Sequence, residues 1–220
     1  MERDSQDNLI ERLRLSWFNL LDRSSAQTKL GDKIFTSLIN SYCDRTRSYH
    51  NLNHIYDILN SIEQVKSITE DLNVLQFSAW FHDRIYNPQS SDNESKSAVC
   101  AVKALEQLNI DRRVIEVVEQ IILSTKNHQP LIDSIDRLLF LDIDLAILGT
   151  TPNKYQKYTQ AIRQEYNHLS DRDYQIGRKK VLTQFLNRER IYYTDYFCQR
   201  LETAARKNLQ TEIAAAMRSH

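Results

Sequence analysis

The sequence contains a histidine followed directly by an aspartate, His82-Asp83, after the apolar residues Ala79, Trp80 and Phe81. Moving a carboxylate out of water costs several kcal/mol or more unless a cation or strong hydrogen bonds compensate. Imidazole and carboxylate groups are also common ligands of divalent metal ions. The pair therefore points to a bound cation, and metal-assisted chemistry is the first hypothesis that it suggests.

Two further residues extend this pair to a set of four metal-binding side chains. His54 lies upstream of the pair and Asp144 lies downstream. Two imidazoles and two carboxylates suit Mn²⁺, Fe²⁺, Co²⁺ or Ni²⁺, leave Zn²⁺ open, and favour Mg²⁺ less. We therefore predict one divalent metal ion held by His54, His82, Asp83 and Asp144.

The elements that position these residues are expected to be helices. Gly and Pro occur only three times each, which leaves few of the turns that strands need. Apolar residues recur at helical spacing in Leu9–Leu21, Ile34–Tyr42, Ile55–Ile68, Ala98–Leu108, Asp111–Lys126, Leu131–Leu148, Val181–Leu186 and Tyr196–Met217. We expect an all-α fold of nine to ten helices and no strand, in which three separate helices supply the ligands.

Residues typical of helix starts and ends indicate where the predicted helices begin and stop. Gly149 suits a left-handed position that closes the preceding helix, and Thr151-Pro152 suits the start of the next one. Residues 91–94, Ser-Asp-Asn-Glu, have the spacing of a capping box. His50 and His54 would share one helical face if their helix begins early enough.

Length and composition bound the class of protein. A chain of 220 residues predicts one domain over 1–220, with a metal-site core at about 47–149 and a helical extension at about 150–220. Lys and Arg total 29 and so do Asp and Glu, which argues against general nucleic-acid binding. The three cysteines are widely spaced and expected to be reduced. With neither a signal core nor a membrane-length segment in the sequence, we expect a cytoplasmic location without membrane contact.

Side chains near the ligands supply candidates for catalysis. Asp83 would be essential as a ligand, and Asp92 and Glu94 could each act as a general base through the water beside the metal. The capping box is the non-catalytic interpretation of Glu94.

A second group of residues could bind the substrate. The basic residues in or beside the motifs are Arg47, Arg84, Lys126, Arg163 and Arg178. Of these we favour Arg84 and Lys126 as partners of a phosphate, because they adjoin the His-Asp pair and His128. His50 and His128 complete the predicted substrate-binding set, and His50 could also act as a ligand or support one.

These motifs together resemble the HD superfamily of metal-dependent phosphohydrolases. More closely, the chain is similar to a poorly characterised bacterial branch of predicted phosphohydrolases, from about Leu9 to Asn208. The segments that carry the resemblance are 47–55, 81–86, 92–98, 142–149 and 177–182. The resemblance implies an HD-domain helical bundle with one metal ion held by His54, His82, Asp83 and Asp144.

The resemblance also bears on two ambiguous positions. Asp142 and Asp144 lie two residues apart and would face different directions on a helix, so only one should bind the ion. The family pattern favours Asp144, leaving Asp142 to orient another group. Binuclear HD proteins generally carry two extra histidines between the His-Asp pair and the final aspartate, and here only His128 is present, which favours a single ion.

The function that these residues imply is metal-dependent hydrolysis of a small phosphorylated molecule, with a nucleotide as the first candidate. Two alternatives stay open. One is a di-iron oxygenase of the HD type, which requires two irons per chain. The other is a metal-binding regulatory or interaction module with little turnover. The sequence leaves the physiological substrate, the native metal and the oligomeric state undetermined.

Overall fold

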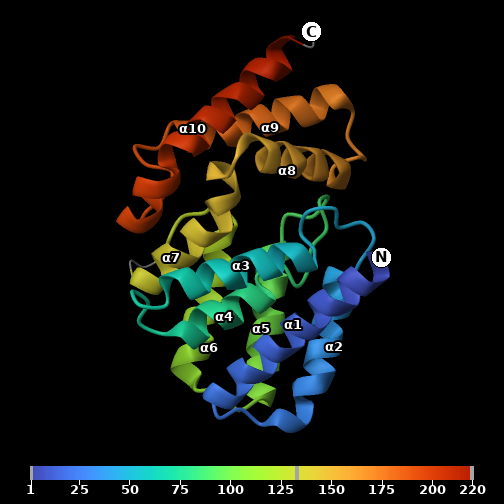
Figure 1. The fold of residues 1–220 in the computed structure, drawn as a ribbon, viewed down its shortest axis with the longest axis vertical. Coiled ribbons are helices and arrows are strands. Elements are labelled where there is room, and N and C mark those ends of the chain that lie inside the picture. The colour runs from blue at the N-terminus through green and yellow to red at the C-terminus, as the bar shows by residue number, and fades with distance from the viewer. Residues whose placement is uncertain (1, 132–133, 219–220) are drawn as a thin grey trace. The chain divides into compact units, whose positions relative to one another are not determined.

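The computed structural model describes residues 2–131 and 134–218, and within these ranges all regular structure is helical (Figure 1). Ten α-helices and two short 3₁₀ helices occur there, and no strand does. The prediction of an all-α protein with nine to ten helices is confirmed for the described residues. None of these helices is both long enough and apolar enough to cross a bilayer.

The chain divides into two compact units, Met1–Phe140 and Leu141–His220. The helices of the first unit are α1 (Glu2–Arg23), η1 (Thr28–Leu30), α2 (Gly31–Tyr42), α3 (Leu52–Val65), α4 (Leu72–Phe81), α5 (Asn93–Gln107), α6 (Arg112–Thr125) and most of α7 (Ile135–Asp144). The second unit holds the last turn of α7, η2 (Leu145–Gly149), α8 (Pro152–Glu165), α9 (Asp171–Leu186) and α10 (Asp195–Arg218). The boundary between the two units falls within α7.

Helix α4 forms the centre of the first unit. Every side chain from Val74 to Phe81 is buried, as expected for a helix that is surrounded by others. The Trp17 ring of α1 meets Phe77, Trp80 and Phe81 of α4 edge-on, with centroids 5.5–6.3 Å apart. Edge-to-face contacts of this kind add to the free energy gained from aromatic burial. The residue that follows this rigid helix is His82.

A buried carboxylate fixes the start of α4. Asp136, on α7, accepts hydrogen bonds from the Thr69 hydroxyl and from the backbone N–H groups of Glu70 and Asp71. Asp71 in turn caps α4 by accepting from the N–H groups of its first turn. The loop before α4 is thereby attached to α7.

The second unit corrects the expectation for Gly149. No glycine in the described residues has a positive φ. A Cβ at Gly149 would instead lie 2.5 Å from the Leu201 Cβ and 3.0 Å from the Tyr192 hydroxyl. Close packing against α10, and not a left-handed backbone, therefore explains why this position has no side chain. Thr151 and Pro152 do begin α8 as predicted.

Candidate metal centre

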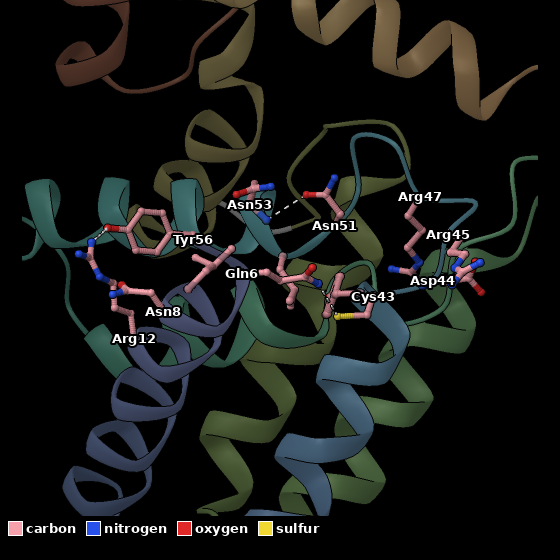
Figure 2. Close-up of a pocket in the computed structure, with 13 residues that line it drawn as sticks. Gln6, Asn8, Arg12, Cys43, Asp44, Arg45, Arg47, Asn51, Asn53 and Tyr56 are labelled. Atoms are coloured by element: carbon pink, nitrogen blue, oxygen red, sulfur yellow. Dashed lines mark hydrogen bonds between the residues drawn. The ribbon is translucent and has the colours of Figure 1, made fainter. Parts of the chain in front are cut away.

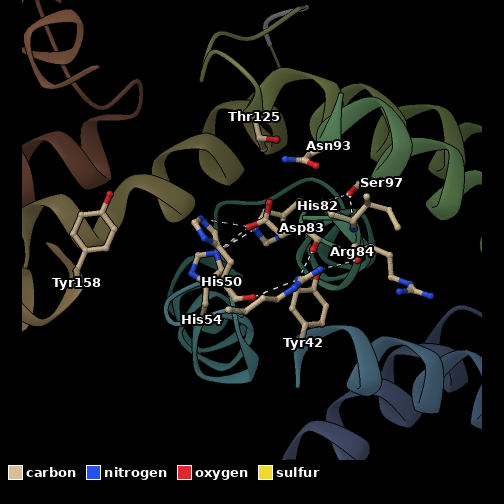
Figure 3. Close-up of polar contacts among 12 residues, drawn as sticks. Tyr42, His50, His54, His82, Asp83, Arg84, Asn93, Ser97, Thr125 and Tyr158 are labelled. Carbon is tan, nitrogen blue, oxygen red and sulfur yellow. Dashed lines mark hydrogen bonds and ion pairs between the residues drawn. The ribbon is translucent and has the colours of Figure 1, made fainter. Parts of the chain in front are cut away.

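The His82-Asp83 pair lies directly after the last residue of α4 (Figure 3). His82 keeps helical backbone angles, and its N–H donates to the Ser78 carbonyl at 2.9 Å. The carboxyl end of a helix carries partial negative charge, which stabilises a nearby cation. The backbone of α4 thus places two candidate ligand side chains, His82 and Asp83, where a positive ion is favoured.

A backbone contact sets the orientation of the His82 ring. Its Nδ1 lies 3.1 Å from the Ala79 carbonyl oxygen, which can only accept a hydrogen bond. Neutral His82 therefore carries its proton on Nδ1 and a lone pair on Nε2. A hydrogen bond at the ring nitrogen that does not bind the metal is the usual way in which proteins orient a metal-binding histidine.

Three metal-binding atoms of the first unit converge at this point. The His82 Nε2 lies 3.1 Å from Asp83 Oδ2 and 3.2 Å from His54 Nε2. The His54 Nε2 is 3.8 Å from the same carboxylate oxygen. Both histidines are buried, with 5% of His54 and 1% of His82 exposed.

The spacing of these atoms fits a shared metal ion. Lone pairs that face each other across 3.2 Å repel unless a proton or a cation lies between them. With metal–nitrogen distances of about 2.1 Å, that separation corresponds to an angle of about 100° at the ion, near octahedral and tetrahedral values. His54 and His82 each offer a ring nitrogen that could bind a metal ion.

His50 joins this cluster, although not in the way we expected. Helix α3 begins at Leu52, so His50 precedes it and shares no helical face with His54. The bend before α3 nevertheless brings the His50 Nε2 to 3.9 Å from Asp83 Oδ2. Its ring also packs against Tyr86, with the two centroids 4.2 Å apart.

Arg47 braces the segment that carries Asp83. Its guanidinium donates to the carbonyl oxygens of Asp83 at 2.6 Å, Arg84 at 3.0 Å and His50 at 3.4 Å. It also lies over the Tyr42 ring, 5.0 Å from the centroid. The sequence indicated Arg47 only as a source of positive charge, because bonds to distant backbone carbonyls leave no pattern in a sequence.

The two basic residues predicted to bind substrate phosphate make other contacts. Arg84 donates to the Ser37 hydroxyl of α2 at 2.7 Å and also to the Ser41 hydroxyl, and it points away from the histidines (Figure 3). The Lys126 ammonium group donates to the Ser91 carbonyl at 2.7 Å, beside the loop that leads into α5.

The loop after Asp83 is fastened to the start of α5. The Asn93 side chain accepts from the N–H of Asn87 at 3.0 Å and donates to its carbonyl at 2.9 Å. The buried Ser97 hydroxyl accepts from the N–H of Ile85 at 2.9 Å. These contacts hold the first turn of α5 beside the His-Asp pair.

The two candidate bases differ in their surroundings. Asp92 stands before α5 without capping it, and hydrogen bonds from the Ser90 hydroxyl and the Lys96 ammonium lower the pKa of its carboxyl group. A lowered pKa makes Asp92 a weak base. Glu94 lies in the first turn of α5 and is half-buried. Helix α5 begins at Asn93, and the side chain of the N-cap residue Asp92 makes no capping hydrogen bond.

His128 lies in the loop after α6, in a left-handed conformation with φ of 46°. Its N–H donates to the Thr125 carbonyl at 3.3 Å, which folds the loop back over the helix end. Non-glycine residues adopt positive φ uncommonly, so the path of this loop is specific.

Asp142 and Asp144 are distinguished by their hydrogen bonds in the second unit. The Asp142 carboxylate is fully buried and accepts from the N–H groups of Tyr193 and Thr194, each at 2.7 Å, and from the Thr194 hydroxyl at 2.6 Å. Burial raises the pKa of Asp142 to about 6, against the opposing effect of these donors. Asp142 therefore anchors the segment before α10. Asp144 is the last residue of α7.

No protein-family model matches this chain, and no curated protein matches it either. The described residues form an all-α protein with a group of His and Asp side chains, of which the histidines are buried, that could hold a metal ion.

Proposed function

We propose that this protein is a metal-dependent phosphohydrolase that acts on a small phosphorylated substrate, with a nucleotide as the first candidate. The observation that carries the proposal is the convergence of His54 Nε2, His82 Nε2 and Asp83 Oδ2 within 3.8 Å of one another. A cation would stabilise two buried imidazoles and a partly exposed carboxylate that face one point.

Asp144 is the fourth ligand in this proposal. The Phe140 ring of α7 packs against His82, with centroids 5.6 Å apart. Asp144 follows four residues later, and residues four apart lie on the same face of a helix. Asp142 is occupied by the N–H and hydroxyl groups of Thr194, so of the two aspartates we propose Asp144 as the ligand.

A divalent ion bound here would lower the pKa of water and neutralise charge on a phosphoryl group. Glu94, from the first turn of α5, would accept the proton that the attacking water loses. His50 would contact the substrate from the side of α3, and His128 would do so from the end of α6. Lys126 stays in the proposal because its ammonium group has three N–H donors and one of them binds the Ser91 carbonyl. Arg84 has no part in the proposed mechanism, because its guanidinium is bound to α2.

The direct test is a screen of the metal-reconstituted chain against nucleotides and generic phosphoesters. We expect phosphate release that depends on the added divalent ion and is abolished in Asp83→Ala. The exposed Asp22→Ala serves as a matched control and should retain full turnover. Turnover that survives Asp83→Ala, or that is absent with every metal tried, would overturn the proposal.

A further inference from the structure

A polar cleft of about 860 Å³ lies in the first unit (Figure 2). Its walls come from the first turns of α1, the loop between α2 and α3, and the start of α3. Neither His50, His54, His82 nor Asp83 is among its lining residues. The cleft is therefore a cavity distinct from the candidate metal centre.

Three arginines from separate segments line this cleft, with Arg12 at one end and Arg45 and Arg47 at the other (Figure 2). Arg12 reaches it from α1, and Arg45 and Arg47 reach it from the loop after α2. The one acidic lining residue is Asp44, which accepts hydrogen bonds from the N–H and hydroxyl of Thr46 at 2.9 and 2.7 Å. Three guanidinium groups against one such carboxylate leave the cleft with a net positive charge.

Two of the arginines are held in place at the wall. The Arg12 guanidinium donates to the Tyr56 hydroxyl of α3 at 3.2 Å. Arg47 is buried and bound to the carbonyls beside the His-Asp pair, whereas Arg45 is exposed. The fork of Arg47 is taken up by those carbonyls, so this side chain adds fixed positive charge, whereas the other N–H groups of Arg12 and the exposed guanidinium of Arg45 can bind phosphate oxygens.

The rest of the lining suits a molecule larger than a bare ion. The side chains of Gln6, Asn8 and Asn53 offer amide donors and acceptors, and all three are exposed. The first residues of α3 also face the cleft, and the amino end of a helix adds partial positive charge. The volume lies in the range of about 300–1,000 Å³ that is usual for small-molecule sites.

We propose that this cleft binds a small phosphorylated molecule at a second site, through Arg12, Arg45 and Arg47. Because Arg47 also holds the carbonyl oxygen of Asp83, a molecule bound there would contact the same side chain that braces the candidate metal centre. This inference does not depend on the proposed hydrolase activity.

The test uses inorganic pyrophosphate as the probe and measures its binding to the full chain by titration calorimetry at 0.15 M salt. Removing the two more exposed arginines in Arg12→Gln/Arg45→Gln should weaken binding by about tenfold or more, because charge-assisted hydrogen bonds are lost. The exposed Arg113→Gln of α6 is the control for removing an arginine outside the cleft and should bind as the unmodified chain does.

A further arm separates the two sites. Asp83→Asn alters the His-Asp cluster and should leave the affinity for pyrophosphate within about twofold, since Asp83 does not line the cleft. Absence of binding to the unmodified chain would overturn the inference. Equal affinity in the double variant and in Arg113→Gln would do the same, and a loss confined to Asp83→Asn would assign the binding to the metal centre.

Discussion

The guanidinium of Arg47 donates a 2.6 Å hydrogen bond to the carbonyl oxygen of Asp83, a residue 36 positions later in the chain. The same group also binds the carbonyls of Arg84 and His50. The buried Arg47 side chain therefore holds the backbone at His50, before α3, and at Asp83 and Arg84, after α4. Groups that orient a metal ligand typically change metal affinity by about 10–100-fold when they are removed.

Arg47→Lys should weaken metal binding by about 10–100-fold and lower the free energy of unfolding by about 1–3 kcal/mol. An ammonium group cannot reproduce a planar fork that serves three carbonyls. Metal titration calorimetry and urea unfolding measure the two effects. Arg84→Lys is the matched control, because it loses contacts to α2 and should reduce stability while keeping metal affinity. Unchanged metal affinity in Arg47→Lys would contradict the bracing role.

Glu94→Gln should reduce kcat by about 10²–10⁴-fold while the protein retains its metal, since the amide cannot accept a proton. Asp92→Asn should have a much smaller effect, because Lys96 and Ser90 already lower the pKa of that carboxyl group. Steady-state kinetics together with metal analysis distinguish the two variants. An equal loss of kcat in both would remove Glu94 from the proposed mechanism.

Asp142→Asn and Asp144→Asn should have opposite consequences. The first replaces a carboxylate that accepts three buried hydrogen bonds and should cost about 2–4 kcal/mol of unfolding free energy. The second should release the metal ion with little loss of stability in the metal-free protein. Urea unfolding in a chelator and metal analysis of each variant provide the comparison. Retention of metal by Asp144→Asn would exclude it as a ligand.

The two glycines of the second unit offer a matched pair for stability. Gly149→Ala should destabilise the chain by about 1–3 kcal/mol, because its methyl group would lie 2.5 Å from the Leu201 Cβ. Gly177→Ala should stabilise α9 by about 0.5–1 kcal/mol, since nothing lies within 4 Å of the added carbon. Thermal and urea unfolding of both variants test the pair, and a stabilising Gly149→Ala would be incompatible with the packing described here.

Helical periodicity predicted the fold class because amphipathic helices repeat their apolar residues locally along the chain. The nearness of His54 to the His-Asp pair could also be predicted, because imidazole and carboxylate groups in apolar segments need a polar or ionic partner. Sequence reasoning was less successful where the determining contact is distant. Asp142 is bound by residues 51 and 52 positions away, and its role as an anchor has no local signal.

Helix ends were a second source of error. His50 precedes α3 and reaches Asp83 from a bend, whereas the sequence suggested a shared helical face with His54. Gly149 was expected to adopt a left-handed backbone, but close approach of α10 explains it. In both cases tertiary contacts, and not local propensity, determine the position of the residue.

Metal counting on the purified chain tests most directly whether His54, His82, Asp83 and Asp144 hold one divalent metal ion. The protein should retain one ion per chain after reconstitution and gel filtration, while His82→Ala should retain none and His128→Ala should keep its ion. No bound ion in the unmodified chain with any divalent metal tried, or equal retention by His82→Ala, would contradict the account. Two irons per chain would favour the oxygenase instead.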